Sequence, residues 1–208
     1  MVGISAPVLL VVEVSPRGSS SVSRALTAIY VDSWKVVNPS GRVIFRDLIE
    51  TRLPFIDLPW IVAANTDPAR HTGEQAAAIA TSDELITELK AADRIVVGTP
   101  MYNLSIPALL KAYLDQIVRI GLTVTADNKG LLTGRSVDVI LASGGDFSPG
   151  SRIEQFNLAR DYLAALFRWI GIGEVNFVLA GRASVADTGD RSINRFREGV
   201  VAAAVRGA

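Results

Sequence analysis

Residues 91–120 read AADRIVVGTPMYNLSIPALLKAYLDQIVRI, and they give the clearest indication of the fold. The short apolar run at residues 95–97 is typical of a strand that is buried on both faces. A polar loop at residues 98–103 follows it, and residues 106–120 have the apolar spacing of an amphipathic helix. This order is the repeating unit of a parallel α/β sheet, which places its ligand sites outside the carboxyl ends of the strands.

The loop after this strand has an unusual composition for a linker. Pro100 fixes one backbone angle and has no N–H to donate. Met101 and Tyr102 offer a flat, polarisable surface, and Asn103 offers both donors and acceptors. We therefore expect this loop to support a planar heteroaromatic ring; the alternative is that Met101 and Tyr102 are ordinary core residues.

Strand and helix patterns alternate along the whole chain. Strands are expected at residues 7–12, 42–48, 95–97, 135–142 and 174–180, and helices at about residues 21–37, 81–91, 106–120, 153–170 and 190–205. Ser82 is the expected cap of the second helix, and residues 65–73, which contain His71, are expected to form a solvated surface loop.

Two phosphate-binding motifs are missing from this pattern. The first strand is not followed by GxGxxG, and GxxxxGK[ST] does not occur, which argues against a dinucleotide-binding sheet and against a P-loop NTPase. The sequence thus predicts a single flavodoxin-like α/β domain over residues 1–208. Its sheet is expected to be doubly wound, parallel and five-stranded, in the order 2-1-3-4-5, with helices on both faces.

The composition narrows the classes of function. The chain has 208 residues, of which 49% are hydrophobic, and its 21 basic residues balance its 21 acidic ones. This balance gives no indication of a nucleic-acid or membrane partner. Cysteine is absent and histidine occurs once, so we predict no metal site and no Cys or Ser-His-Asp nucleophile. Neither a secretory signal nor a run of roughly 20 apolar residues is present, and the cytoplasm is the expected location.

Two further loops are expected at the ligand edge of the sheet. Residues 15–24, SPRGSSSVSR, lead into a helix, where free N–H groups and the helix dipole favour an anion such as a phosphomonoester. The alternative is that Ser21 or Ser23 only caps the helix. Residues 143–145, Ser-Gly-Gly, allow a ligand to approach the backbone closely, and the alternative there is a plain turn. With residues 100–104, these loops predict a three-loop ligand site.

With these motifs in place, the chain resembles the FMN-dependent NADH-azoreductases, which are also NADH:quinone oxidoreductases of flavodoxin-like fold. The resemblance covers essentially the whole chain, and PMYN after a buried strand is its more specific part. The segments that carry it are the Ser-rich loop at 15–23, PMYN at 100–103, ELITELKAAD at 84–93, KAYLD at 111–115, GLLTG at 130–134, SGG at 143–145 and FRWIGI at 167–172.

The resemblance implies a set of cofactor-binding residues. The Ser loop would bind the FMN phosphate, the MYN segment would lie along the flavin ring, and the loop after the fourth strand would close over the other edge of the ring. The residues implicated are Ser15, Ser21, Val22, Ser23, Pro100, Met101, Tyr102, Asn103, Leu104, Ala142, Ser143, Gly144 and Gly145. No catalytic side chain is implied, because N5 of the flavin carries the chemistry.

The chain departs from these enzymes in two places. Relatives often read Ser-Arg-Gly-Gly where this chain reads ASGG at residues 142–145, so an arginine is missing. Relatives also carry aromatic residues that face the flavin from the partner subunit, whereas this chain has VTADN at residues 124–128. We therefore expect a more open or differently lined substrate pocket, for which Trp60, Phe147 and Phe55 are candidate lining residues.

The implied activity is NAD(P)H oxidation coupled to the reduction of quinones, azo compounds or nitroaromatic compounds by ping-pong, two-electron hydride transfer. Either NADH or NADPH fits as co-substrate. The resemblance also implies a homodimer with residues 119–122 near the contact. Three other hypotheses stay open: a flavodoxin-type electron carrier, which would usually be acidic; a non-catalytic flavin-binding protein; and a metal-independent phosphodiesterase that uses the Ser loop.

Overall fold

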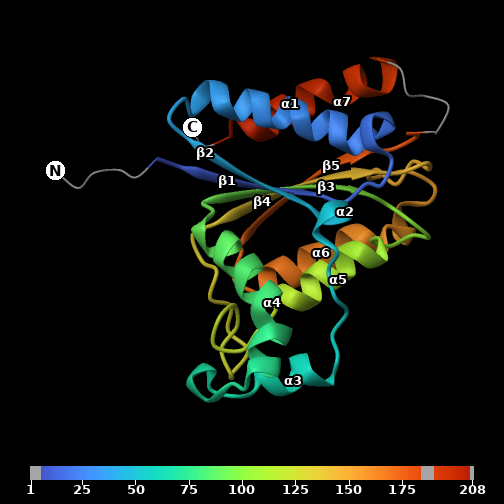
Figure 1. The fold of residues 1–208 in the computed structure, drawn as a ribbon. Coiled ribbons are helices and arrows are strands. Elements are labelled where there is room, and N and C mark those ends of the chain that lie inside the picture. Colours follow the sequence, from blue (N-terminus) through green and yellow to red (C-terminus); the bar gives the residue numbers. More distant parts are fainter. Residues whose placement is uncertain (1–5, 184–189, 207–208) are drawn as a thin grey trace.

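The computed structural model describes residues 6–183 and 190–206. Its centre is a five-stranded sheet in which every neighbouring pair is parallel and the order is β2-β1-β3-β4-β5 (Figure 1). The strands are β1 (Val8–Glu13), β2 (Arg42–Asp47), β3 (Arg94–Pro100), β4 (Ser136–Ala142) and β5 (Glu174–Ala180). The predicted fold class and strand order are confirmed.

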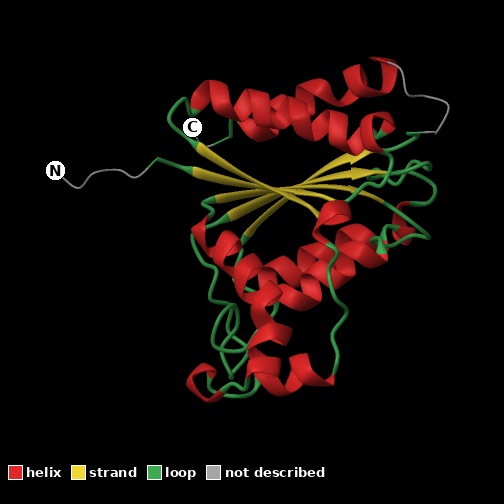
Figure 2. Ribbon diagram, viewed as in Figure 1, coloured by secondary structure: helices red, strands yellow, loops and turns green. Residues whose placement is uncertain are grey.

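Helices cover both faces of this sheet (Figure 2). Two pack against each other on one face, α1 (Val22–Val37) and α7 (Asp190–Ala204). Three lie on the other face, α4 (Gly73–Ala91), α5 (Ala108–Ile117) and α6 (Leu158–Trp169). Two short helices complete the chain, α2 (Leu48–Thr51) directly after β2 and α3 (Leu58–Ala64) packed on α4. Among the described residues, none of the helices is both long and apolar enough to cross a bilayer.

The central strands are apolar on both faces because helices cover both. Leu9, Leu10, Val11 and Val12 of β1 are each 0% exposed. Successive side chains of a strand point to opposite faces. Accordingly, Leu10 and Val12 join the core beneath α4, α5 and α6, while Leu9 and Val11 join the core beneath α1 and α7. Full burial of each such side chain stabilises the fold by about 1.5–3 kcal/mol.

A buried carboxylate helps to tie four elements together near the amino-terminal edge of the sheet, namely β3, β4, α1 and α7. Asp138 on β4 is 1% exposed, and Tyr30 on α1 donates a 2.5 Å hydrogen bond to its Oδ2. Arg94 donates from Nε to the same oxygen at 3.1 Å, and its Nη atoms donate to carbonyls of Ala203 and Ala204 at the end of α7. The charge of Arg94 offsets the desolvation of Asp138, and the pair fastens α7 to the sheet.

Helix α4 is longer than predicted. Thr72 begins it with a capping box, in which its Oγ1 accepts from the Gln75 N–H at 3.2 Å and Gln75 Oε1 accepts from the Thr72 N–H at 3.0 Å. The prediction that Ser82 caps this helix is wrong. Ser82 lies in its middle, is 0% exposed, and donates to the Gln116 carbonyl at 2.5 Å.

Two other helices are shorter than predicted, and two were missed. The helix expected over residues 153–170 begins only at Leu158, because the Asn157 side chain accepts from the Arg160 N–H at 3.1 Å and caps α6. The helix expected over residues 106–120 is limited to α5. Helices α2 and α3 are too short to show a clear period in the sequence.

Candidate functional site

Three loops at the carboxyl ends of β1, β3 and β4 surround a cleft of about 340 Å³. Parallel strands end at one edge, so the sheet brings together loops that are far apart in the sequence. The lining residues are Ser15, Arg17, Ser21, Val22, Ser23, Pro100, Met101, Tyr102, Ala142, Ser143, Gly144 and Ala183.

The loop between β1 and α1 is held by its own polar side chains. Ser21 is the N-cap of α1, since its Oγ accepts from the Arg24 N–H at 3.3 Å, and it lies 3.1 Å from Ser23 Oγ. Arg24 also donates from Nε to the Ser15 carbonyl at 2.8 Å and forms a bidentate pair with Asp47 at 2.6 and 2.9 Å. The charge of Arg24 is thus committed to fastening this loop to the end of β2.

The first turn of α1 keeps N–H donors for a ligand. A helix leaves its first four N–H groups without intrahelical acceptors. The N–H groups of Arg24 and Ala25 bond to Ser21, whereas those of Val22 and Ser23 have no acceptor among the described residues. Val22 and Ser23 both line the cleft, and the helix dipole adds roughly half a positive charge there. This end of the cleft therefore suits an anion.

The loop between β3 and α5 contains a tight reverse turn. Tyr102 and Ser105 exchange main-chain hydrogen bonds of 2.9 and 3.0 Å. The two central residues, Asn103 and Leu104, have φ angles of 49° and 69°. Positive φ at both positions is what a type I′ turn requires, and it is unfavourable for leucine. Such a conformation is typical of a segment whose shape serves a ligand site.

Met101 and Tyr102 form an apolar wall of the cleft. Met101 packs against the core beneath α4, α5 and α6 and also lines the cleft, so it combines the two roles that its sequence context allowed. Its N–H donates to the Ala142 carbonyl at 2.7 Å, which fixes the wall to the end of β4. Tyr102 is 43% exposed and is therefore not a core residue.

The two glycines of the loop after β4 have different roles. A Cβ on Gly145 would lie 2.8 Å from the Phe147 ring, so this glycine is required by packing. A Cβ on Gly144 would meet nothing within 4 Å, and Gly144 lines the cleft. Ser143 donates from Oγ to the Gly145 carbonyl at 2.9 Å and from its N–H to the Ala180 carbonyl at 3.0 Å. The loop is therefore ordered against β5.

The structure brings most of the predicted site residues to this cleft. Those that do not line it are Asn103 and Leu104, which lie at the tip of the reverse turn, and Gly145, which packs against Phe147. Two lining residues were not predicted, Arg17 and Ala183. Arg17 carried a signal, because it is a basic residue within a Ser- and Gly-rich loop; Ala183, after β5, carried none.

A buried carboxylate lies behind the loop between β1 and α1. Glu13 ends β1, is 9% exposed, and its Oε2 has no hydrogen-bond partner among the described residues. Burial raises the pKa of Glu13 from 4.5 to about 7; the Arg24 charge lowers it, and the Asp47 charge raises it. The absence of a Cβ at Gly98 makes room for Oε2 and for Thr27 Oγ1, which such a Cβ would approach to 2.9 and 2.3 Å.

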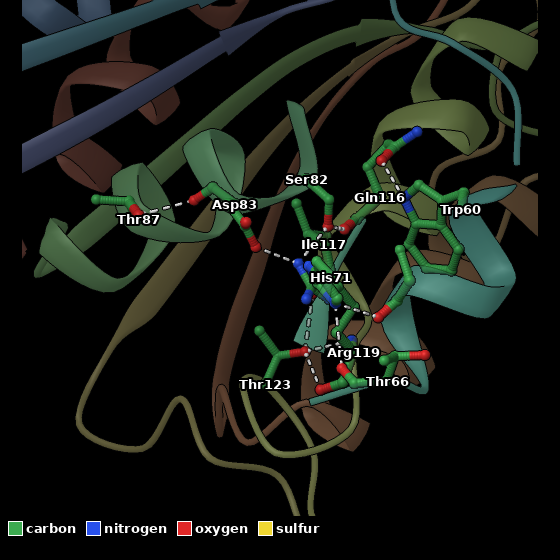
Figure 3. Close-up of polar contacts among 11 residues, drawn as sticks. Trp60, Thr66, His71, Ser82, Asp83, Thr87, Gln116, Ile117, Arg119 and Thr123 are labelled. Carbon is green, nitrogen blue, oxygen red and sulfur yellow. Dashed lines mark hydrogen bonds and ion pairs between the residues drawn. The ribbon is translucent and has the colours of Figure 1, made fainter. Parts of the chain in front are cut away.

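None of the three candidate pocket residues lines the cleft, and Phe55, which precedes α3, is 76% exposed. Trp60 is 9% exposed and donates from Nε1 to Gln116 Oε1 at 2.8 Å, in the lobe formed by α3, α4 and the end of α5 (Figure 3). Phe147 is buried, and neither residue lines the cleft. His71 lies in a loop, as expected, but it is half-buried rather than fully solvated, and its Nε2 lies 3.0 Å from the Ala63 carbonyl.

The same lobe holds the start of the segment that leads to residues 124–128. Arg119 is 8% exposed; it pairs with Asp83 and donates to Ser82 Oγ at 3.2 Å (Figure 3). Thr123 accepts from the Arg119 N–H at 2.9 Å and donates to the Ile117 carbonyl at 2.8 Å. The start of this segment is therefore anchored by polar contacts.

The family model for the flavodoxin-like fold matches residues 8–203. The FMN-dependent NADH:quinone oxidoreductase 2 of Jannaschia sp. is 46% identical over 190 residues, which cover 91% of this chain and 93% of that protein. The chain belongs to the FMN-dependent NADH:quinone oxidoreductase family. Another relative, the FMN-dependent NADH:quinone oxidoreductase 8 of Burkholderia lata, is 44% identical over 192 residues, which cover 92% of this chain and 91% of that protein.

A solved structure agrees with membership of the FMN-dependent NADH:quinone oxidoreductase family. It is an FMN-dependent NADH-azoreductase from Bacillus anthracis in complex with FMN, with a TM-score of 0.85 and 26% identity over 96% of this chain and 98% of that one. The cleft of this family member fits such a cofactor. One end suits an anion, because the N–H groups of Val22 and Ser23 have no acceptor among the described residues, and the other end is the apolar wall of Met101 and Tyr102.

Proposed function

We propose that this chain is an FMN-dependent NAD(P)H oxidoreductase that reduces quinones, azo compounds and nitroaromatic compounds. The observation that carries the proposal is the cleft, because it joins phosphate-type donors to an apolar wall at the ligand edge of the sheet. Ser15, Ser21, Val22 and Ser23 would hold the phosphate. Pro100, Met101 and Tyr102 would support the ring on one side, and Ala142, Ser143 and Gly144 would border its other edge.

The residues of the cleft supply binding, orientation and electrostatics. FMN, when bound, would supply the two-electron redox chemistry that links the nicotinamide to the acceptor. Met101 is fixed to β4 by its N–H, which sets the position of the wall before any ligand binds. Tyr102 is 43% exposed, so part of its side chain would be available to substrates. The described cleft has no His or acidic side chain, so solvent is the proposed source of protons for the product.

A homodimer is also part of the proposal. Its support is a groove of about 390 Å³ between α5 and α6, lined mainly by apolar side chains that include Leu114, Val118 and Leu166. Trp169 at its end is 44% exposed, and Ile120, just beyond α5, is 64% exposed. Apolar surface of this kind is typical of an interface. A partner seated there would cover residues 119–122, and light scattering of the purified chain would measure the assembly.

Steady-state kinetics test the proposed activity. The purified chain with FMN should oxidise NADH rapidly when a quinone is present. Double-reciprocal plots of initial rate against quinone concentration, at several fixed NADH concentrations, should be parallel if the order is ping-pong. An azo dye and a nitroaromatic compound replace the quinone in further assays. A flavodoxin-type carrier or a non-catalytic flavin-binding protein would bind FMN but show almost no NADH oxidation with any of these acceptors.

A cytoplasmic location is also proposed, and cell fractionation would test it.

A further inference from the structure

Arg17 places a cation in the cleft that the Ser-rich motif did not require. It is the only charged residue that lines the cleft within the described part of the chain. Its Nη2 atom is buried and has no hydrogen-bond partner among the described residues. A buried charged donor without an acceptor is costly, and such a group calls for a ligand or another explanation.

The neighbouring arginine cannot take this role. Arg24 is engaged by Asp47 through both Nη atoms and by the Ser15 carbonyl through Nε. The Nε and both Nη atoms of Arg24 therefore already have acceptors within the protein. Arg17 differs from Arg24, because its contact with Ser15 is made by the main-chain N–H, which lies 3.4 Å from Ser15 Oγ. Its guanidinium Nη2 has no hydrogen-bond partner among the described residues.

The backbone at Arg17 and Gly18 has the angles of an anion-binding turn. Arg17 has φ −80° and ψ 2°, and Gly18 follows with φ +52°. Successive residues with right-handed and then left-handed angles turn their N–H groups toward a common point and form an anion-binding concavity. The free N–H groups of Val22 and Ser23 lie at the other end of this loop.

We infer that Arg17 binds the phosphomonoester of the cofactor and makes the cleft select FMN over riboflavin. This inference rests on the proposed flavin site. A guanidinium fork matches two phosphate oxygens and stays charged at every working pH. The serine hydroxyls and N–H groups would orient the phosphate, and Arg17 would supply the charge that neutral donors lack.

Flavin-binding titrations of Arg17→Met test the inference. Dissociation constants for FMN and for riboflavin are measured by quenching of flavin fluorescence in the full chain. We expect Arg17→Met to weaken FMN binding about 10- to 100-fold, the range for one hydrogen-bonded charge, and to change riboflavin binding less than about twofold. Arg17→Lys keeps the charge but loses the guanidinium fork, so its dissociation constant for FMN should lie between those of the wild type and Arg17→Met. Arg70→Met, at an exposed arginine outside the cleft, is the matched control and should bind both flavins as the wild type does.

The outcomes separate this inference from the proposed function. If Arg17→Met binds FMN as tightly as the wild type, or loses affinity for FMN and riboflavin equally, Arg17 does not recognise the phosphate and the inference is overturned. The flavin site itself would still stand. A wild-type chain that binds neither flavin overturns both.

Discussion

Replacement of Glu13 by glutamine should make the protein more stable at alkaline pH and leave it nearly unchanged at acid pH. The carboxylate is 9% exposed, and Oε2 lacks a partner among the described residues. Burial raises its pKa from 4.5 to about 7. The folded protein therefore favours the neutral form, and ionisation of Glu13 costs folding free energy.

The magnitude follows from the two pKa values. A shift from 4.5 to about 7 corresponds to about 3 kcal/mol at 1.36 kcal/mol per pKa unit. Because the pKa is higher in the folded state, the stabilising contribution is fully present below about pH 4.5 and is lost as the pH rises to about 7. Glu13→Gln cannot ionise, so it should avoid this loss.

Urea unfolding without added FMN, followed by circular dichroism, measures the effect. The free energies of unfolding of the wild type and Glu13→Gln should agree at about pH 4.5 and differ by up to about 3 kcal/mol at about pH 8.5, with the variant more stable. Glu198→Gln, at an exposed position on α7, is the control and should show no such difference. If the difference between Glu13→Gln and the wild type is the same at both pH values, the account of Glu13 is wrong.

Substitutions at Asn103, Gly130 and Tyr30 test the packing of the fold, and Gly173→Ala is a matched control. In urea unfolding, the free energy of unfolding of Asn103→Gly should lie within about 0.5 kcal/mol of the wild-type value. That of Asn103→Val should be about 1–2 kcal/mol lower, because valine is β-branched and the position has positive φ. Gly130→Ala should lower the free energy of unfolding by more than about 3 kcal/mol, because its Cβ would lie 2.1 Å from the backbone that follows α6. The control Gly173→Ala, whose Cβ would meet nothing within 4 Å, should lower it by less than about 1 kcal/mol. Equal losses in the two variants would contradict this account. Tyr30→Phe should lower the melting temperature through a loss of about 1–3 kcal/mol, because Asp138 loses a buried donor, and an unchanged value would show that this bond contributes nothing.

The strand order and the ligand edge were predictable because they depend on simple patterns. Unbroken apolar runs at residues 8–12 and 95–97 are typical of strands that are buried on both faces of a sheet. The polar loops that follow them must then meet at one edge. The motifs PMYN and SGG could therefore be assigned to one cleft from the sequence alone.

The helix starts were less predictable, for a physical reason. Ser82 precedes acidic residues and an apolar stretch, as a cap does, but Thr72 with Gln75 forms an equivalent signal earlier in the chain. A residue that matches a capping pattern can equally lie inside a helix when its hydroxyl finds another acceptor, as Ser82 does at the Gln116 carbonyl.

Side-chain direction in the cleft was the least predictable. Asn103 is a common residue at positive φ, but nothing in the sequence indicated the same angle for Leu104. That pair of angles takes Asn103 and Leu104 out of the cleft lining. Arg17 was missed because a basic residue in a serine loop is a weak signal and is usually solvated. The stronger indication is its buried Nη2, which has no hydrogen-bond partner among the described residues.

An anaerobic absorption experiment tests the central claim most directly. The purified chain is mixed with FMN, separated from free flavin, and its spectrum is recorded before and after addition of NADH and then of a quinone. We predict flavin absorption that remains with the protein, is lost when NADH is added and returns when the quinone is added. A chain that retains no flavin, or whose bound flavin is not bleached by NADH, would contradict the assignment of the cleft as the site of an NADH:quinone oxidoreductase.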